Sequence, residues 1–214
     1  AALQLASIRH IHEAWDDVVT LTLSPLPDVT AEAYKALDGV ATAANLPQLS
    51  AMLQTASGYA VTMIQKAMLS ALAPESPSVQ YDTISRLMSS AKNPVLYYPM
   101  LAQAGTPEAV ATLIEGYKGK NREAAVQALL LVENPDVRET IFDIASQTSG
   151  TERDALLGRY LALVKKADLT PAQSYTAYSR ALDVNPGDEV KQAMIASLTR
   201  CPIFPAAMRA AYYF

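Results

Sequence analysis

The chain has 214 residues, of which 50% are hydrophobic, 7% aromatic and 18% charged, and its formal net charge at pH 7 is −4. This composition is ample for a packed core, and it lacks the excess of basic residues that attracts phosphate backbones, so we do not expect a nucleic-acid partner. The single cysteine, Cys201, excludes an internal disulfide, and no apolar run has the roughly 18 residues of a membrane span, so no membrane insertion is expected.

The predicted elements follow one another as pairs of helices. Apolar residues recur at helical spacing in short segments, and breaks rich in Pro, Gly, Ser and Thr separate these segments. The first pair is expected to be truncated and the chain to be a piece of a longer protein, because it begins inside helical sequence. In chain order, the predicted pairs occupy residues 1–25, 28–57, 58–91, 92–118, 120–148, 151–184 and 187–214.

The segment 92–147 contains two consecutive copies of this pattern of helix, break and helix. In its second copy, the residues at i, i+3, i+4 and i+7 form one apolar helix face, made of Ala125, Ala128, Leu129 and Val132. The break follows at Asn134 and Pro135, where Asn134 can cap the next helix and Pro135 suits its first position. The first copy breaks in the same way at Gly105, Thr106 and Pro107.

The helix faces recur with a regular period. Six small-then-large or similar apolar pairs lie 28 to 33 residues apart: Ala36 and Leu37, Ala67 and Met68, Met100 and Leu101, Ala128 and Leu129, Tyr160 and Leu161, Ala193 and Met194. A mean step of about 31 residues is typical of repeated helical hairpins. One hairpin leaves apolar surface bare on both flanks, and stacking covers it. We therefore predict an all-α solenoid of about six antiparallel hairpins, forming a single helical-repeat domain over residues 1–214.

The repeats resemble the HEAT family and the related armadillo repeats. The resemblance is carried by REAAVQALLLVENPDVRETIFDIA and AEAYKALDGVATAANLPQLSAML, in which an apolar helix, a short turn and a second apolar helix follow one another. The family's Asp, Val, Arg signature is partly kept at Asp136, Val137 and Arg138, although here it falls in a second helix. The resemblance implies a right-handed α-α superhelix whose second helices line a concave binding surface. The ankyrin TPLH turn and the tetratricopeptide pattern are absent.

One cluster combines histidines with carboxylates. His10 and His12 lie beside Glu13, Asp16 and Asp17, which are the residue types of metal and acid–base sites. Such sites usually need another ligand from a distant part of the fold, and none is visible, so we interpret the cluster as a solvated helix start. No catalytic, cofactor-binding or metal-binding residue is predicted, and no cofactor.

Tyrosine accounts for 11 residues and supplies the candidate binding residues. Its large rigid ring and polar tip favour binding surfaces, so Tyr97, Tyr98, Tyr175 and Tyr178 are predicted to contact a partner. Tyr175 and Tyr178 are the better candidates because they lie on a second helix. Neighbouring residues point about 100° apart on a helix, so at least one ring of an adjacent pair is expected to be exposed. Alternatively, the rings pack between helices with their hydroxyl groups at the rim.

Three functions remain open from the sequence. The leading hypothesis is a non-catalytic scaffold that binds a protein or peptide through its second helices. The alternative is an accessory helical domain of a larger bacterial carbohydrate-processing enzyme, whose partners are other domains of the same parent chain. If that enzyme is secreted, the chain lies outside the cytoplasm. An independent enzyme would require carboxylates such as Glu108, Asp136 and Asp143 to converge in one cleft.

Overall fold

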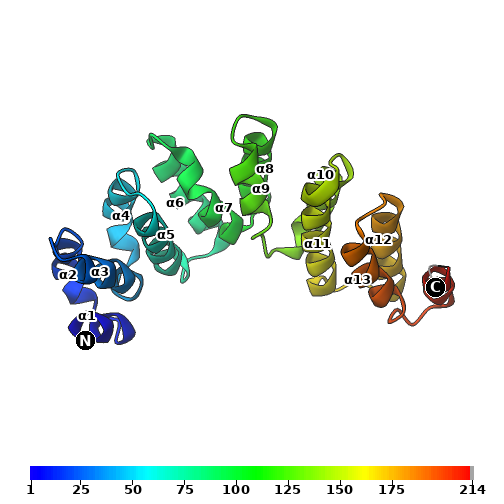
Figure 1. The fold of residues 1–214 in the computed structure, drawn as a ribbon, viewed down its shortest axis with the longest axis horizontal. Helices are drawn as coiled ribbons and strands as arrows, with labels where there is room; N and C mark the ends of the chain where they lie inside the picture. Colours follow the sequence, from blue (N-terminus) through cyan, green and yellow to red (C-terminus); the bar gives the residue numbers. More distant parts are fainter. Residues whose placement is uncertain (213–214) are drawn as a thin grey trace. The chain divides into compact units, whose positions relative to one another are not determined.

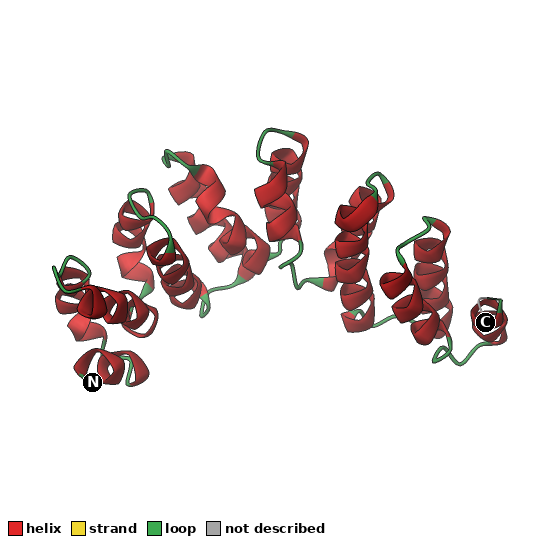
Figure 2. Ribbon diagram, viewed as in Figure 1, coloured by secondary structure: helices red, strands yellow, loops and turns green. Residues whose placement is uncertain are grey.

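All regular structure that the computed structural model describes, over residues 1–212, is helical (Figures 1 and 2). The prediction of an all-α fold is confirmed. None of the helices in this range combines the length and the apolar character needed to cross a membrane.

Each predicted pair contains two α-helices, which we call its first and second helix; residues 213 and 214 of the last pair lie outside the described part of the chain. In order, these are α1 (Ala2–Ile8) and α2 (Trp15–Leu21), α3 (Pro27–Val40) and α4 (Leu46–Leu53), α5 (Tyr59–Leu72) and α6 (Pro77–Ser89), α7 (Tyr98–Ala104) and α8 (Pro107–Lys118), α9 (Arg122–Leu129) and α10 (Arg138–Ser146), α11 (Gly150–Lys166) and α12 (Pro171–Asp183), α13 (Asp188–Leu198) and α14 (Phe204–Ala211). Four 3-10 turns precede second or first helices, namely η1 (His12–Ala14), η2 (Ala43–Asn45), η3 (Pro94–Tyr97) and η4 (Pro135–Val137).

The predicted breaks use the expected chemistry. Gly105 ends α7 in the left-handed conformation, with φ of 58°. The Thr106 hydroxyl accepts a hydrogen bond from the Ala109 amide at 3.2 Å, as a helix cap does. Asn134 Oδ1 accepts from the Asp136 amide at 3.0 Å. Pro135 therefore starts a helical turn, as predicted, but this turn is the 3-10 helix η4, and α10 begins three residues later.

The chain divides into two compact units, residues 1–109 and residues 110 onward. In unit 1, the first helices pack on one another in order, α1 on α3, α3 on α5 and α5 on α7. Each second helix also packs on the first helix of the following pair, α2 on α3, α4 on α5 and α6 on α7. The core of this unit is therefore shared between neighbouring pairs.

Unit 2 repeats this packing scheme. Within this unit, α11 is the first helix of its pair and contacts the first helices of both neighbouring pairs, α9 and α13. The second helix α10 packs on α11, and the second helix α12 packs on α13. Six apolar side chains of α11 are buried as a result: Leu156, Leu157, Tyr160, Leu161, Leu163 and Val164. A helix with so many buried positions needs neighbours on more than one side.

The predicted apolar pairs are buried throughout, with one exception. Both members of the first five pairs are buried, and so is Met194. Ala193 is exposed instead, because the buried face of α13 is formed by Met194, Ser197 and Leu198.

A glycine sets the closest approach in unit 1. Gly39 lies near the end of α3 and faces the backbone of Ser7 at the end of α1. A Cβ atom at Gly39 would lie 2.6 Å from the Ser7 carbonyl carbon, a distance that side chains do not tolerate. The contact between α1 and α3 therefore requires a residue without a side chain at this position.

We expect Gly39→Ala to lower the free energy of unfolding of unit 1 by about 1–3 kcal/mol, because the added methyl group forces α1 away from α3. The matched control is Gly158→Ala in α11, where a Cβ atom would meet nothing within 4 Å. This control should be neutral or more stable by up to about 1 kcal/mol, since alanine favours helix. Chemical denaturation of the two variants measures both effects, and equal stability of the two would contradict the close contact.

Candidate functional site

The adjacent tyrosines Tyr97 and Tyr98 are both buried, with 0% and 6% of their surface exposed. The expectation that one of them is exposed is wrong, because η3 contacts α6 while α7 packs on both α5 and α6. The Tyr97 hydroxyl lies 2.6 Å from Ser50 Oγ and 3.3 Å from Gln54 Nε2, both contributed by α4 and its C-terminal cap. Tyr97 thus anchors its own pair to a pair further back in unit 1.

The second tyrosine pair is divided between interior and surface. Tyr178 is buried, and burial raises its pKa. Tyr175 is half-buried. Contact of these four tyrosines with a partner stays a prediction, and Tyr175 has the most accessible ring of the four.

The histidine cluster has a structural role. His10 Nδ1 lies 3.1 Å from the Gly39 carbonyl oxygen, and His12 Nδ1 lies 3.1 Å from that of Val40. These carbonyls end α3, where a helix has no internal donors left for them. The five residues of the cluster are exposed at the start of η1 and α2, as the interpretation as a solvated helix start expects, and the two rings also bind the end of α3. Over residues 1–212, no three His, Cys, Asp or Glu side chains are grouped so that they could hold a metal ion.

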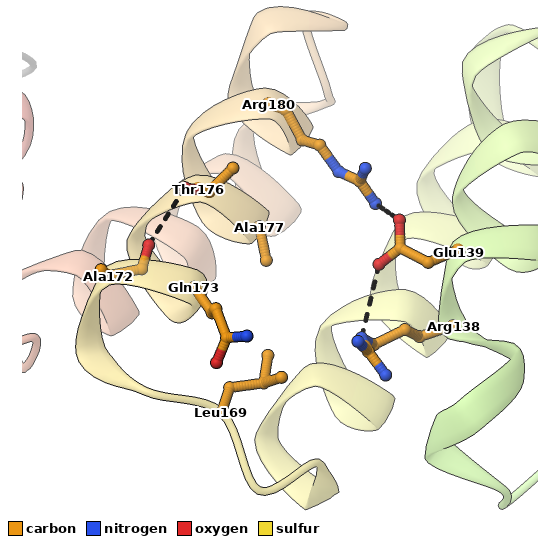
Figure 3. A pocket seen from close by; sticks show the side chains of 8 residues that line it. All are labelled: Arg138, Glu139, Leu169, Ala172, Gln173, Thr176, Ala177 and Arg180. Carbon is orange, nitrogen blue, oxygen red and sulfur yellow. Dashed lines mark hydrogen bonds and ion pairs between the residues drawn. The ribbon is translucent and has the colours of Figure 1, made fainter.

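A hollow of about 320 Å³ lies between the second helices α10 and α12 of unit 2 (Figure 3). We call it the α10–α12 hollow. Its charged rim faces an apolar part formed by small and aliphatic side chains. The lining residues are Arg138, Glu139, Leu169, Ala172, Gln173, Thr176, Ala177 and Arg180.

Arg180 is the best-fixed side chain of the hollow. Its guanidinium lies over the Phe142 ring, 4.0 Å from the centroid, and its Nε donates to the Tyr160 hydroxyl at 3.2 Å. Its Nη2 donates to Glu139 Oε2. Burial alone would lower the pKa of Arg180, but the hydrogen bonds to Glu139 and Tyr160 raise it overall. The group is therefore a permanent, oriented cation.

Glu139 is shared between two arginines. Its Oε2 accepts from Arg180 of α12, and its Oε1 lies 3.4 Å from Nε of Arg138 on its own helix (Figure 3). Arg138 is held in turn by a 3.1 Å hydrogen bond from Nη1 to the Pro135 carbonyl oxygen. One carboxylate thus connects two guanidinium groups across the hollow.

The rings of Phe142 and Tyr160 pack against each other next to Arg180. The rings of Phe142 and Tyr160 are 5.1 Å apart and tilted by 47°. The Tyr160 hydroxyl donates to the Ala177 carbonyl oxygen at 3.3 Å, and burial raises the pKa of Tyr160. The side chains of Phe142 in α10 and Tyr160 in α11 and the Ala177 carbonyl group in α12 are therefore linked next to Arg180.

A second hollow lies between the second helices α4 and α6 in unit 1. It is more apolar, and it is lined by Ala43, Leu46, Pro47, Leu72, Glu75, Val79, Thr83, Arg86 and Leu87. Within each unit, neighbouring second helices therefore leave a concave surface between them.

The sequence did not single out Glu139, Gln173 or Arg180. Their signal would be opposite charges on consecutive second helices, which a solvated helix face shows equally well. Asp183 of α12 and Arg209 of α14 are likewise opposite charges on consecutive second helices, and they form an ion pair.

Comparison of the chain with protein-family models, with curated proteins and with solved structures found no match. What the chain does must therefore be inferred from its own residues.

We expect Tyr160→Phe to lower the free energy of unfolding by about 1–2 kcal/mol, because Ala177 and Arg180 each lose a hydrogen-bond partner. Denaturant unfolding measures this loss. Tyr175→Phe, at the half-buried position, is the control and should change stability little.

The same variant should alter the pH dependence of stability. The pKa of Tyr160 is raised in the folded protein, so the unfolded chain loses this proton first. The contribution to stability is complete below a pH of about 10, the ordinary tyrosine value, and is lost as pH rises through the folded pKa. Tyr160→Phe should therefore lose less stability than the wild type above that pH, and parallel curves would contradict the shift.

Proposed function

We propose that the chain is a non-catalytic HEAT-like repeat scaffold that binds a protein or peptide through its second helices. In this proposal, the helix pairs stack into a right-handed α-α superhelix. The packing inside each unit supports the stacking: over the described residues 1–212, every closely packed pair of helices belongs to the same predicted pair or to neighbouring ones. In a globule with one central core, helices distant in sequence would also pack closely.

The contacts between first helices also support the proposed stacking. In unit 1, α3 packs between α1 and α5, and in unit 2, α11 packs between α9 and α13. Hollows lie between the second helices α10 and α12 and also between the first helices α9 and α11, and the hollow between α10 and α12 carries the oriented guanidinium of Arg180.

The observation that carries the binding role is the α10–α12 hollow itself. It combines an oriented guanidinium, further polar groups and uncovered aliphatic surface, which is the mixture typical of peptide-binding clefts. Its lining residues come from two neighbouring helix pairs, so a bound chain would run across the pairs.

The non-catalytic part of the proposal is supported by the carboxylates. Asp136 and Asp143 are solvent-exposed, unlike the enclosed carboxylates of acid–base catalysis, and Glu108 belongs to the other unit.

A matched pair of variants tests the binding surface. Ala172 is exposed at the α10–α12 hollow, and Ala155 is exposed at a hollow between the first helices α9 and α11. We expect Ala172→Arg to weaken binding of a partner at least tenfold, because the long side chain fills the hollow, while Ala155→Arg leaves binding unchanged. Affinity is measured by calorimetry with a partner recovered from native extract on the immobilised wild type. The reverse order of effects would place binding on the first helices and contradict the proposal.

A further inference from the structure

We propose that the α10–α12 hollow binds a peptide by the side-chain carboxylate of a Glu or Asp residue, with Arg138, Arg180 and Gln173 as the hydrogen-bond donors. This inference rests on the proposed function and specifies the chemistry of the partner at that surface.

Three hydrogen-bond donors remain available around the hollow. Arg180 uses Nε and Nη2, and Arg138 uses Nε and Nη1, which leaves one Nη group of each without a partner within residues 1–212. Gln173 uses its Oε1 to accept from the amide and hydroxyl of Thr170, so its Nε2 is available as well. Three unused donors at one hollow favour a ligand that accepts hydrogen bonds.

The local charge distinguishes a carboxylate from a phosphate. The hollow carries two guanidinium groups and the one carboxylate of Glu139, which leaves one net positive charge. A singly charged carboxylate neutralises it, whereas a phosphate with nearly two negative charges would leave an uncompensated charge beside Glu139. Guanidinium groups also match the planar carboxylate in geometry.

The donors are ordered before a ligand arrives. Phe142 and Tyr160 hold the guanidinium of Arg180, and the Pro135 carbonyl oxygen holds that of Arg138. In Figure 3 the two arginines lie on either side of Glu139, and Gln173 extends from α12 toward the same space. A ligand therefore need not immobilise these long side chains, which reduces the entropic cost of binding.

The aliphatic residues of the hollow favour an aliphatic residue next to the acidic residue of the bound peptide. Leu169, Ala172 and Ala177 provide an aliphatic surface next to the polar rim. An acidic residue followed or preceded by an aliphatic one would occupy both parts of the hollow.

The test uses three short peptides with acetylated and amidated ends, so that each has one ionisable side chain at most. Each contains a central Glu, Gln or phosphoserine beside a leucine, flanked by alanine and glycine. Titration into the ¹⁵N-labelled protein is followed by the Nε–Hε signals of Arg138 and Arg180. We expect saturable shifts with the Glu peptide and at least tenfold weaker binding of the Gln peptide.

The decisive variant is Gln173→Glu. It keeps an acceptor for the capping box at Thr170, so α12 should still form, but it replaces a donor in the hollow by a negative charge. We expect it to reduce binding of the Glu peptide at least tenfold. Arg122→Gln, on α9, removes an arginine that also pairs with a glutamate and should leave binding unchanged.

Each other outcome overturns the inference. Equal binding of the Glu and Gln peptides would remove the role of charge, and tighter binding of the phosphoserine peptide would make the site a phosphate site. Absence of binding by all three would exclude this hollow as a peptide site. Equal Glu and Gln binding with Ala172→Arg still inhibitory would leave the proposed function intact, so the two failures are distinguishable.

Discussion

Burial of the two flanks of each helix pair is the constraint on which this structure depends. A pair such as α11 and α12 is too short to enclose its own apolar residues, and α11 alone buries six of them. They become buried because α9, α10 and α13 also pack on α11. In unit 1, α3 is covered in the same way by α1, α2 and α5. Stability therefore comes from contacts between neighbouring pairs, and small residues such as Gly39 are needed where two backbones meet.

Buried polar anchors add specificity to this apolar packing. The hydroxyl of Tyr97 meets Ser50 and Gln54, and that of Tyr160 meets Ala177 and Arg180. An apolar face alone would tolerate a shift of one helix along another, but a buried hydroxyl is satisfied in one register only. The hydroxyl groups of these tyrosines have hydrogen-bond partners inside the protein. This explains why tyrosines, a residue type typical of binding surfaces, lie in the core.

The same packing produces the candidate site. The groups at the α10–α12 hollow come from α10, from α12 and from Leu169 just before α12, and the Phe142 and Tyr160 rings connect them to the core. The guanidinium groups of Arg138 and Arg180 are thus held without any bound ligand, and the charge of the hollow follows from these two arginines, which share one glutamate. The outward positions of second helices can change in sequence while the core between neighbouring helices stays constant.

The sequence by itself determined the helices and nearly all of the buried faces, because apolar periodicity and helix capping are local properties that Thr106, Asn134 and Pro135 display directly. Only the tertiary structure decided which polar residues meet. Arg180 is hydrogen-bonded to Glu139, which is 41 residues away in the sequence, and Tyr97 to Ser50, which is 47 residues away. Such partners depend on how far and at what angle neighbouring helices pack, and no local pattern in one sequence encodes that geometry.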